Sequence, residues 1–263
     1  LMETMERTCY SIDSERIRRK FDRACLTYDE AAVAQQQIAR HLSAIWEVYQ
    51  QKHRFRPATA LEIGCGTGGF TRYLQQSCAS ALWTLNDLYP TCADKALSYC
   101  AEGTRFVCAD AATKAWKGPY QLIASSSVFQ WIPEPESFVG RLAGCQRRGD
   151  VLLFSTFLPG NLVEIRELTG QGLFYPSAEQ WNDWLEPFYQ VDFQEIETIR
   201  LLFTSPQAVL RHLKETGVTA NHSEFWTPGK LRTFCAAYQE KFGTNNQQVT
   251  LTYRPLYILA VRK

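Results

Sequence analysis

The stretch Glu62-Ile63-Gly64-Cys65-Gly66-Thr67-Gly68 decides how this sequence is interpreted. It ends the apolar run Ala58 to Ile63, which is typical of a buried strand, and leads into Gly69-Phe70-Thr71, where a helical pattern begins. Three glycines between a strand and a helix leave the backbone bare, so that a ligand can approach it closely. We therefore expect a ligand-binding turn, with a tight turn that binds nothing as the alternative.

Strand and helix patterns alternate around this turn. The strand-like runs are Ala58 to Ile63, Leu82 to Asn86, Arg105 to Ala109, Leu122 to Ser126 and Val151 to Thr156, with helical patterns through Leu74, over Cys92 to Cys100 and over Glu136 to Arg147 between them. Alternation of this kind predicts an α/β fold, a doubly wound, mostly parallel sheet with helices on both faces.

The two flanks of this region have a different character. Residues 14–50 predict an N-terminal helical segment, basic at first and then amphipathic. Helices are expected near Glu179 to Leu185, Pro206 to Thr216 and Pro228 to Phe242, and strands over Asp192 to Phe203 and Val249 to Val261. The two late strands should pair in antiparallel fashion and finish the sheet. We expect a single domain over residues 1–263, with a core over about 58–157 and 190–263 and a helical lid within about 158–245.

Composition excludes several classes of function. The net charge of +1, from 28 basic and 27 acidic residues, gives no reason to expect a nucleic-acid partner. Nine scattered cysteines and four histidines lack metal-site or disulfide spacing, so we expect no metal and a reducing, cytoplasmic location. No apolar run approaches the ~18 residues of a membrane span, and no signal-peptide pattern opens the sequence. The sequence begins at Leu1, which we interpret as a start at a tag or within a longer polypeptide.

Three carboxylates stand at the ends of three successive predicted strands. Glu62 precedes the glycines, where it opposes a bound pyrophosphate and suits a cationic ligand group. Asp87 ends the second strand and is placed to accept hydrogen bonds from both ribose hydroxyls. Asp110 ends the third, where it is placed to accept from an adenine amine. Together they predict a nucleoside with a cationic tail.

The glycine loop, Asp87 and Ala109-Asp110-Ala111 resemble the motifs of class I S-adenosylmethionine-dependent methyltransferases over residues 58–157. Segments outside these motifs resemble, nearly end to end, the malonyl-acyl-carrier-protein O-methyltransferases of biotin synthesis. They are residues 21–37, Ser126 to Trp131, Phe154 to Glu164, Ser205 to Gly217 and Leu251 to Tyr257. The first twenty or so residues match no family in this way.

The resemblance implies a Rossmann-like, seven-stranded fold and a defined reaction. S-adenosylmethionine would methylate the free carboxylate of malonyl-acyl carrier protein, or of malonyl-CoA, to a methyl ester that primes pimeloyl and biotin synthesis, leaving S-adenosylhomocysteine. The cofactor-binding residues that it implies are Tyr28, Glu62, Gly64, Gly66, Gly68, Asp87, Leu88, Asp110, Ala111 and Ser126.

Methylation of a carboxylate needs no general acid or base, because the group is already ionised at pH 7. Candidates for the acceptor pocket are Ser127, Phe129, Gln130 and Trp131, where aromatic walls exclude water and the glutamine orients a carbonyl or carboxylate. Phe129 and Trp131 as ordinary core aromatics are the alternative.

Cations are expected to recognise both the acyl group and its carrier. Arg141 and Arg166 are candidates for the substrate carboxylate, because the guanidinium fork matches two oxygens, although either one can equally be a surface residue. Carrier protein is acidic, and the densest basic cluster that could dock it is Arg16, Arg18, Arg19, Lys20 and Arg23, which otherwise forms a solvated helix face.

Two rival functions remain open at this point. One is a small-molecule carboxylate methyltransferase of the trans-aconitate type, which Phe129 to Pro133 also resembles and which needs no carrier protein. The other is a nucleotide-binding Rossmann module without transferase activity, either non-catalytic or NAD-linked. The sequence does not distinguish the acceptors, and it leaves the oligomeric state open.

Overall fold

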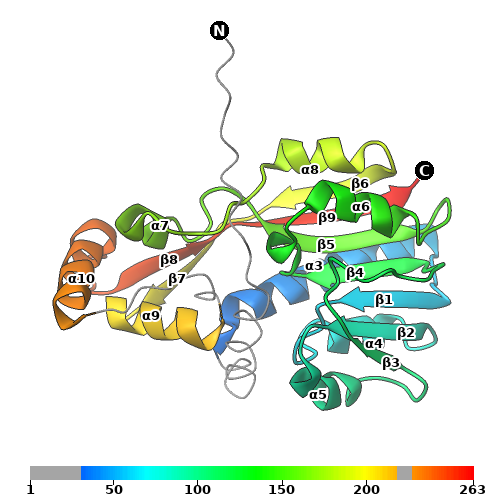
Figure 1. Ribbon diagram of the computed structural model, residues 1–263, viewed down its shortest axis with the longest axis horizontal. Coiled ribbons are helices and arrows are strands. Elements are labelled where there is room, and N and C mark those ends of the chain that lie inside the picture. The colour runs from blue at the N-terminus through cyan, green and yellow to red at the C-terminus, as the bar shows by residue number, and fades with distance from the viewer. Residues whose placement is uncertain (1–30, 218–226) are drawn as a thin grey trace, which may run out of the picture.

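A computed structural model describes residues 31–217 and 227–263 of the 263-residue chain (Figure 1). Tyr28 and the basic cluster Arg16, Arg18, Arg19, Lys20 and Arg23 lie outside the described residues. Within those two ranges, no helix combines the length and the apolar character that crossing a bilayer requires.

The core is a seven-stranded sheet in the order β3-β2-β1-β4-β5-β9-β6 (Figure 1). Its strands are β1 (Thr59–Ile63), β2 (Leu82–Asp87), β3 (Arg105–Cys108), β4 (Leu122–Ser126), β5 (Val151–Phe157), β6 (Tyr189–Ile196) and β9 (Pro255–Arg262). The first five strands run parallel, and β9 is antiparallel to both of its neighbours, β5 and β6. The predicted mostly parallel, seven-stranded fold is confirmed.

Helices cover both faces of this sheet, so that its central strands are buried on both sides. Successive residues of β5 show the division, since Leu153 packs with the helices of one face and Leu152 with those of the other. The first face carries α3 (Val33–His53), α4 (Thr71–Ser77) and α5 (Ala93–Leu97), and the second carries α6 (Pro135–Ala143) and α8 (Ala178–Leu185). Helix α8 was expected near the lid, but Trp181 and Leu185 pack into the core of the second face.

Two strands outside the seven-stranded sheet pair with each other and form the base of the lid. The predicted strand Asp192 to Phe203 is divided into β6 and β7 (Ile199–Phe203), and the predicted strand Val249 to Val261 into β8 (Val249–Tyr253) and β9. β7 pairs with β8 as a separate antiparallel ribbon, on the left in Figure 1, together with α7 (Val163–Thr169), α9 (Pro206–Glu215) and α10 (Pro228–Phe242). The antiparallel pairing was expected, but the division into two sheets was not.

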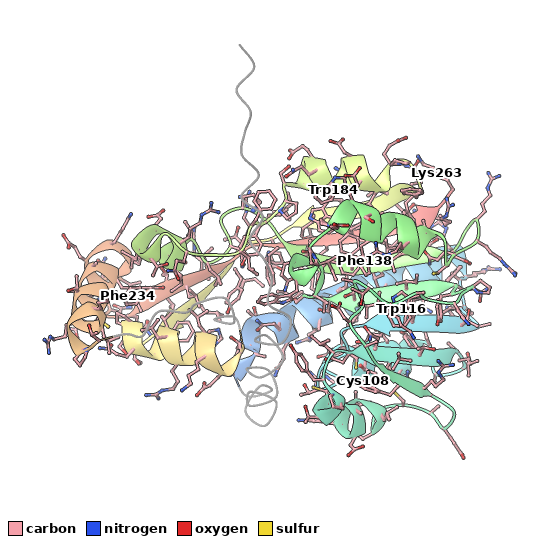
Figure 2. All side chains as sticks on the ribbon, viewed as in Figure 1. Cys108, Trp116, Phe138, Trp184, Phe234 and Lys263 are labelled. Atoms are coloured by element: carbon pink, nitrogen blue, oxygen red, sulfur yellow. The ribbon has the colours of Figure 1, made fainter. Side chains whose placement is uncertain are left out.

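A buried carboxylate ties α7 to this ribbon. Glu164, 2% exposed, accepts hydrogen bonds from the Thr252 backbone N–H at 3.0 Å and from the hydroxyls of Thr252 at 2.6 Å and Thr250 at 3.4 Å. Figure 2 shows how far the lid extends, because Phe234 on α10 lies toward the left end of the molecule, whereas Trp116 and Lys263 lie on its right-hand side. The lid is therefore a distinct packed unit beside the end of the sheet.

Candidate active site

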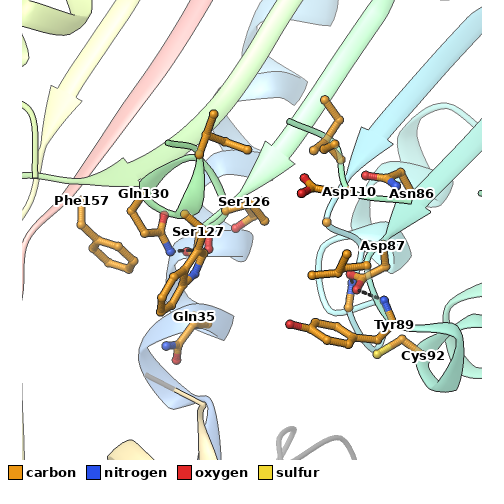
Figure 3. A pocket seen from close by; sticks show the side chains of 18 of the residues that line it. Gln35, Asn86, Asp87, Tyr89, Cys92, Asp110, Ser126, Ser127, Gln130 and Phe157 are labelled. Carbon is orange, nitrogen blue, oxygen red and sulfur yellow. Dashed lines mark hydrogen bonds between the residues drawn. The ribbon is translucent and has the colours of Figure 1, made fainter. Parts of the chain in front are cut away.

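One cavity runs along the edge of the sheet where the parallel strands end (Figure 3). Among the residues that line it, Asp110 follows β3, Asp87 ends β2, Gly64 follows β1, Ser126 ends β4, Phe157 ends β5 and Tyr253 ends β8. In open α/β sheets, ligands bind in the crevice outside the carboxyl ends of the strands. The cavity therefore lies where the alternation of strands and helices predicts a ligand.

The three glycines of the loop serve different purposes, and all have positive φ angles. A Cβ on Gly64 would lie 2.3 Å from a methyl carbon of Val128, and one on Gly68 would lie 2.7 Å from the Tyr99 ring. A Cβ on Gly66 would meet nothing within 4 Å. Gly64 and Gly66 line the cavity, whereas Gly68 serves the packing of the loop and does not line it.

Asp87 joins the loop to the end of β2. Its Oδ2 accepts a hydrogen bond from the Gly66 backbone N–H at 2.7 Å, and its Oδ1 accepts from the Tyr89 N–H at 3.0 Å (Figure 3). A carboxylate can accept several hydrogen bonds, and Asp87 also lines the cavity. Leu88, the next residue, also lines the cavity.

Asp110 and Ala111 line the neighbouring part of the cavity. The Oδ1 of Asp110 accepts from the Ala112 N–H at 2.8 Å. Asn86 holds this segment in place, because its side-chain amide donates to the Val107 carbonyl at 3.0 Å and to the Ala109 carbonyl at 2.8 Å. Asn86 was not singled out from the sequence; a polar residue at the end of an apolar strand was the available signal.

Glu62 lies beneath the loop rather than in the wall of the cavity. It is 1% exposed, and its Oε2 accepts from the Thr71 hydroxyl at 2.7 Å. Burial, together with the nearby charge of Asp87, raises the pKa of Glu62 to about 8, although the Thr71 hydrogen bond opposes the shift. In the structure Glu62 joins the loop to the start of α4. The sequence had predicted direct contact with a ligand cation instead.

The segment after β4 contributes buried polar atoms that have no hydrogen-bond partner in the described part of the chain. Ser127 adopts a positive φ of 58°, and its N–H donates to the Ser155 carbonyl at 3.1 Å. The Gln130 amide nitrogen donates to the Ser127 carbonyl at 2.6 Å (Figure 3). Ser127 Oγ and Gln130 Oε1 are buried and have no hydrogen-bond partner among the described residues. Both residues and Trp131 line the cavity.

Phe129, in the same segment, is a core aromatic. It begins the 3-10 helix η2 (Phe129–Trp131), is 1% exposed, and does not line the cavity. Its ring stacks on Phe154 with the centroids 4.5 Å apart and lies edge-on to Phe138 at 5.3 Å. The expected place of Phe129 in the pocket wall gives way to the alternative of core packing, because the three side chains of a 3-10 turn point in directions about 120° apart, and that of Phe129 points into the core.

Neither candidate arginine lines the cavity. Arg141 is exposed on α6, where its guanidinium donates to the Ser137 hydroxyl at 2.9 Å and to the Ala112 carbonyl. Arg166 is exposed on α7. The alternative noted for both, that they are surface residues, agrees with these positions. A spacing in sequence could not distinguish a surface guanidinium from one that faces the cavity.

The end of the cavity nearest the lid was not anticipated residue by residue. Phe157, Asn161, Tyr175 and Tyr253 line it, and the Asn161 amide nitrogen donates to the Tyr175 hydroxyl at 2.9 Å. The Phe157 ring lies 6.4 Å from that of Tyr175 and 6.0 Å from that of Tyr253. These residues come from the end of β5, the loops around α7 and the end of β8, so only the fold brings them together.

Comparisons of sequence agree with the motifs in the cavity. A family model described as a methyltransferase domain matches residues 32–222. The malonyl-[acyl-carrier protein] O-methyltransferase of Porphyromonas gingivalis W83 is 43% identical over 251 residues, which cover 95% of this chain and 96% of that protein. The protein of the same name from Haemophilus ducreyi is 39% identical over 94% of this chain and 96% of its own.

Solved structures share the fold at low sequence identity. The N-methyltransferase NodS from Bradyrhizobium japonicum, in complex with S-adenosylhomocysteine, aligns with a TM-score of 0.54 and 12% identity over 94% of this chain and 98% of its own. The magnesium protoporphyrin IX methyltransferase of Synechocystis, also with S-adenosylhomocysteine, gives 0.54 and 16% over 87% and 83%. Fold, cavity and full-length relatives together show that this chain belongs to the malonyl-[acyl-carrier protein] O-methyltransferase family.

Proposed function

We propose that this protein transfers the methyl group of S-adenosylmethionine to the free carboxylate of a malonyl thioester carried by acyl carrier protein. The observation that carries the proposal is the 43% identity to a malonyl-[acyl-carrier protein] O-methyltransferase over 95% of the chain, lid included. The cavity supports it, because it joins nucleoside-type acceptors at the strand ends to a second region formed with the lid.

The order of the strands orients the cofactor in this proposal. Asp110 after β3 would accept from the adenine amine, and Asp87 at the end of β2 would accept from the ribose hydroxyls. The bare backbone at Gly64 and Gly66 leaves room for the methionyl part beside β1. The acceptor Gln130 Oε1 would then face the cationic end of the cofactor, because its amide nitrogen is already bonded to Ser127.

The proposed reaction requires no general acid or base from the protein. Bound S-adenosylmethionine would supply an electrophilic methyl group: a malonyl carboxylate oxygen would attack the methyl carbon, and the electron pair of the broken carbon–sulfur bond would stay on sulfur as S-adenosylhomocysteine forms. No proton moves. Because a carboxylate and a sulfonium cancel each other's charge, exclusion of water strengthens their attraction and favours the step. Trp131 and Phe157 supply apolar walls for this purpose, and alignment of the two reactants supplies the rest.

The carrier protein is the partner that the family implies. Its docking site on this chain stays a prediction, because the basic cluster Arg16, Arg18, Arg19, Lys20 and Arg23 lies outside the described residues. A role in priming pimeloyl and biotin synthesis follows in the same way from the family resemblance.

Methyl transfer with labelled S-adenosylmethionine tests the proposal. We expect label on malonyl-acyl carrier protein, as a base-labile methyl ester, and little label on trans-aconitate or free malonate. Label confined to the free acids would show that the protein is a small-molecule carboxylate methyltransferase. Calorimetric titration with S-adenosylhomocysteine and with NAD addresses the second rival, and binding of NAD alone would refute the proposed cofactor.

A further inference from the structure

The region of the cavity beside β5 and β8 remains open once the cofactor is placed. That the acyl group enters this region rests on the proposed function. The cofactor groups follow β3, β2, β1 and β4 in spatial order, and β5 and β9 are the next strands in the sheet. Phe157, Asn161, Tyr175 and Tyr253 line the cavity at this point. The methyl acceptor must approach from this side, because the nucleoside occupies the other.

The hydrogen bonds of Asn161 determine the direction in which Tyr175 donates. The Arg254 backbone N–H can only donate, and it lies 3.0 Å from Asn161 Oδ1. This fixes the orientation of the amide, so that Asn161 Nδ2 faces the Tyr175 oxygen at 2.9 Å and donates to it. The Tyr175 oxygen is therefore an acceptor in this pair, and its own proton remains available to a ligand.

Tyr175 is also kept in its neutral, proton-donating form. Its side chain is 6% exposed, and Asn161 is 4% exposed. Burial raises the pKa of Tyr175 to about 12, with the Asn161 hydrogen bond and the charge of Arg166 acting in the opposite direction. At neutral pH the phenol thus remains a hydrogen-bond donor in a dry part of the cavity.

No lysine or arginine lines the cavity within residues 31–217 and 227–263. Among the described residues that line this end of the cavity, a carboxylate therefore meets the neutral donor Tyr175. This suits its role as a nucleophile, because a bidentate ion pair would stabilise the ground-state charge that must attack the methyl group. We infer that the Tyr175 hydroxyl, oriented by Asn161, binds one oxygen of the malonyl carboxylate and leaves the other to attack the methyl group.

Two substitutions of tyrosine test this role. Tyr175→Phe removes the donor and keeps the ring. Tyr238→Phe is the matched control, because Tyr238 is a fully buried lid tyrosine whose hydroxyl donates to the Thr250 carbonyl at 2.7 Å and which does not line the cavity. For Tyr175→Phe we expect kcat/KM with malonyl-acyl carrier protein to fall about 10- to 100-fold, which corresponds to one hydrogen bond to a charged group.

Acetyl-acyl carrier protein, which lacks the carboxylate, separates this role from general packing. Its inhibition constant, and the affinity for S-adenosylhomocysteine, should be the same in Tyr175→Phe, Tyr238→Phe and the wild type within about twofold. Equal weakening of acetyl- and malonyl-acyl carrier protein in Tyr175→Phe would overturn the inference, as would unchanged kcat/KM. If the wild type transfers no methyl group to malonyl-acyl carrier protein, the proposed function itself fails and the inference fails with it.

Asn161→Asp gives a second test that leaves Tyr175 in place. One aspartate oxygen still accepts from the Arg254 N–H. The other replaces the Asn161 Nδ2 donor, so that it accepts the Tyr175 proton and no longer donates to the Tyr175 oxygen. We expect the same selective loss of malonyl over acetyl binding as in Tyr175→Phe, with thermal unfolding measured to establish that the variant is folded. A folded Asn161→Asp variant that retains full malonyl preference would contradict the proposed direction of the hydrogen bond.

Discussion

Replacement of Glu62 by glutamine should remove a pH dependence of stability that the structure builds into the glycine loop. Glu62 is 1% exposed, and its pKa is raised from 4.5 to about 8, mainly by burial. Between these two values the folded protein holds a proton that the unfolded chain releases, so the free energy of unfolding falls as pH rises. The stabilisation is complete below about pH 4.5 and is lost as pH rises to about 8.

The magnitude follows from the size of this shift. Each pH unit inside the window changes the free energy of unfolding by about 1.4 kcal/mol, so that the step from about pH 5 to about pH 7 lowers it by up to about 3 kcal/mol. Glutamine is neutral at both pH values, and its oxygen can still accept from the Thr71 hydroxyl. The Glu62→Gln variant should therefore lack this part of the slope.

Urea unfolding of both proteins at the two pH values measures the difference, in which all other titrating groups cancel. Glu102→Gln is the matched control, because Glu102 is exposed on the surface, and its slope should equal that of the wild type. Parallel slopes for Glu62→Gln and the wild type would refute the reasoning, since they would show that Glu62 is ionised in the folded protein near pH 7.

Three further outcomes are expected. Gly66→Val should abolish binding of S-adenosylhomocysteine in calorimetry, because the side chain enters the cavity. Gly103→Val, at another open position of positive φ, should cost similar stability but leave binding intact. Retained binding by Gly66→Val would show that the loop does not contact the cofactor. Asp110→Asn keeps the acceptor for Ala112 and should weaken that binding by ~1 to 2 kcal/mol, about 5- to 30-fold; an unchanged affinity would place the adenine elsewhere. Glu164→Gln loses an acceptor for the threonine donors of β8 and should lower the free energy of unfolding by about 1 to 3 kcal/mol in urea titration, and unaltered stability would contradict its role in holding α7.

The half of the cavity that is proposed to bind the cofactor was predictable, because it depends on periodicity and position. Parallel strands end at one edge of the sheet, so Asp87 and Asp110 had to lie near the glycine loop once the alternation was recognised. The role of Glu62 was harder to predict, because burial under the loop decides it, and the sequence does not report which side of a turn a side chain faces.

The other half depends on contacts between distant segments. The roles inferred for Asn161 and Tyr175 depend on a contact with Arg254, which is 93 residues from Asn161 in the chain. A single sequence carries no signal for such a contact. Phe129 illustrates the opposite difficulty, since its place in an aromatic segment beside the cavity suggested a wall, whereas the three-residue turn directs it into the core.

The chain order separates the two halves of the cavity. Except for Gln35 on α3, the residues that line it before position 134 belong to the cofactor end and the segment after β4, and those from Phe157 onward belong to the end beside the lid. The residues proposed to hold the cofactor thus precede α6 in the chain, whereas those of the proposed acceptor end follow β5. Exchange of the lid parts alone, α7 and the stretch from β7 to β8, is therefore a direct way to change the acceptor and retain the methyl donor, because it leaves β6 and α8 in the core.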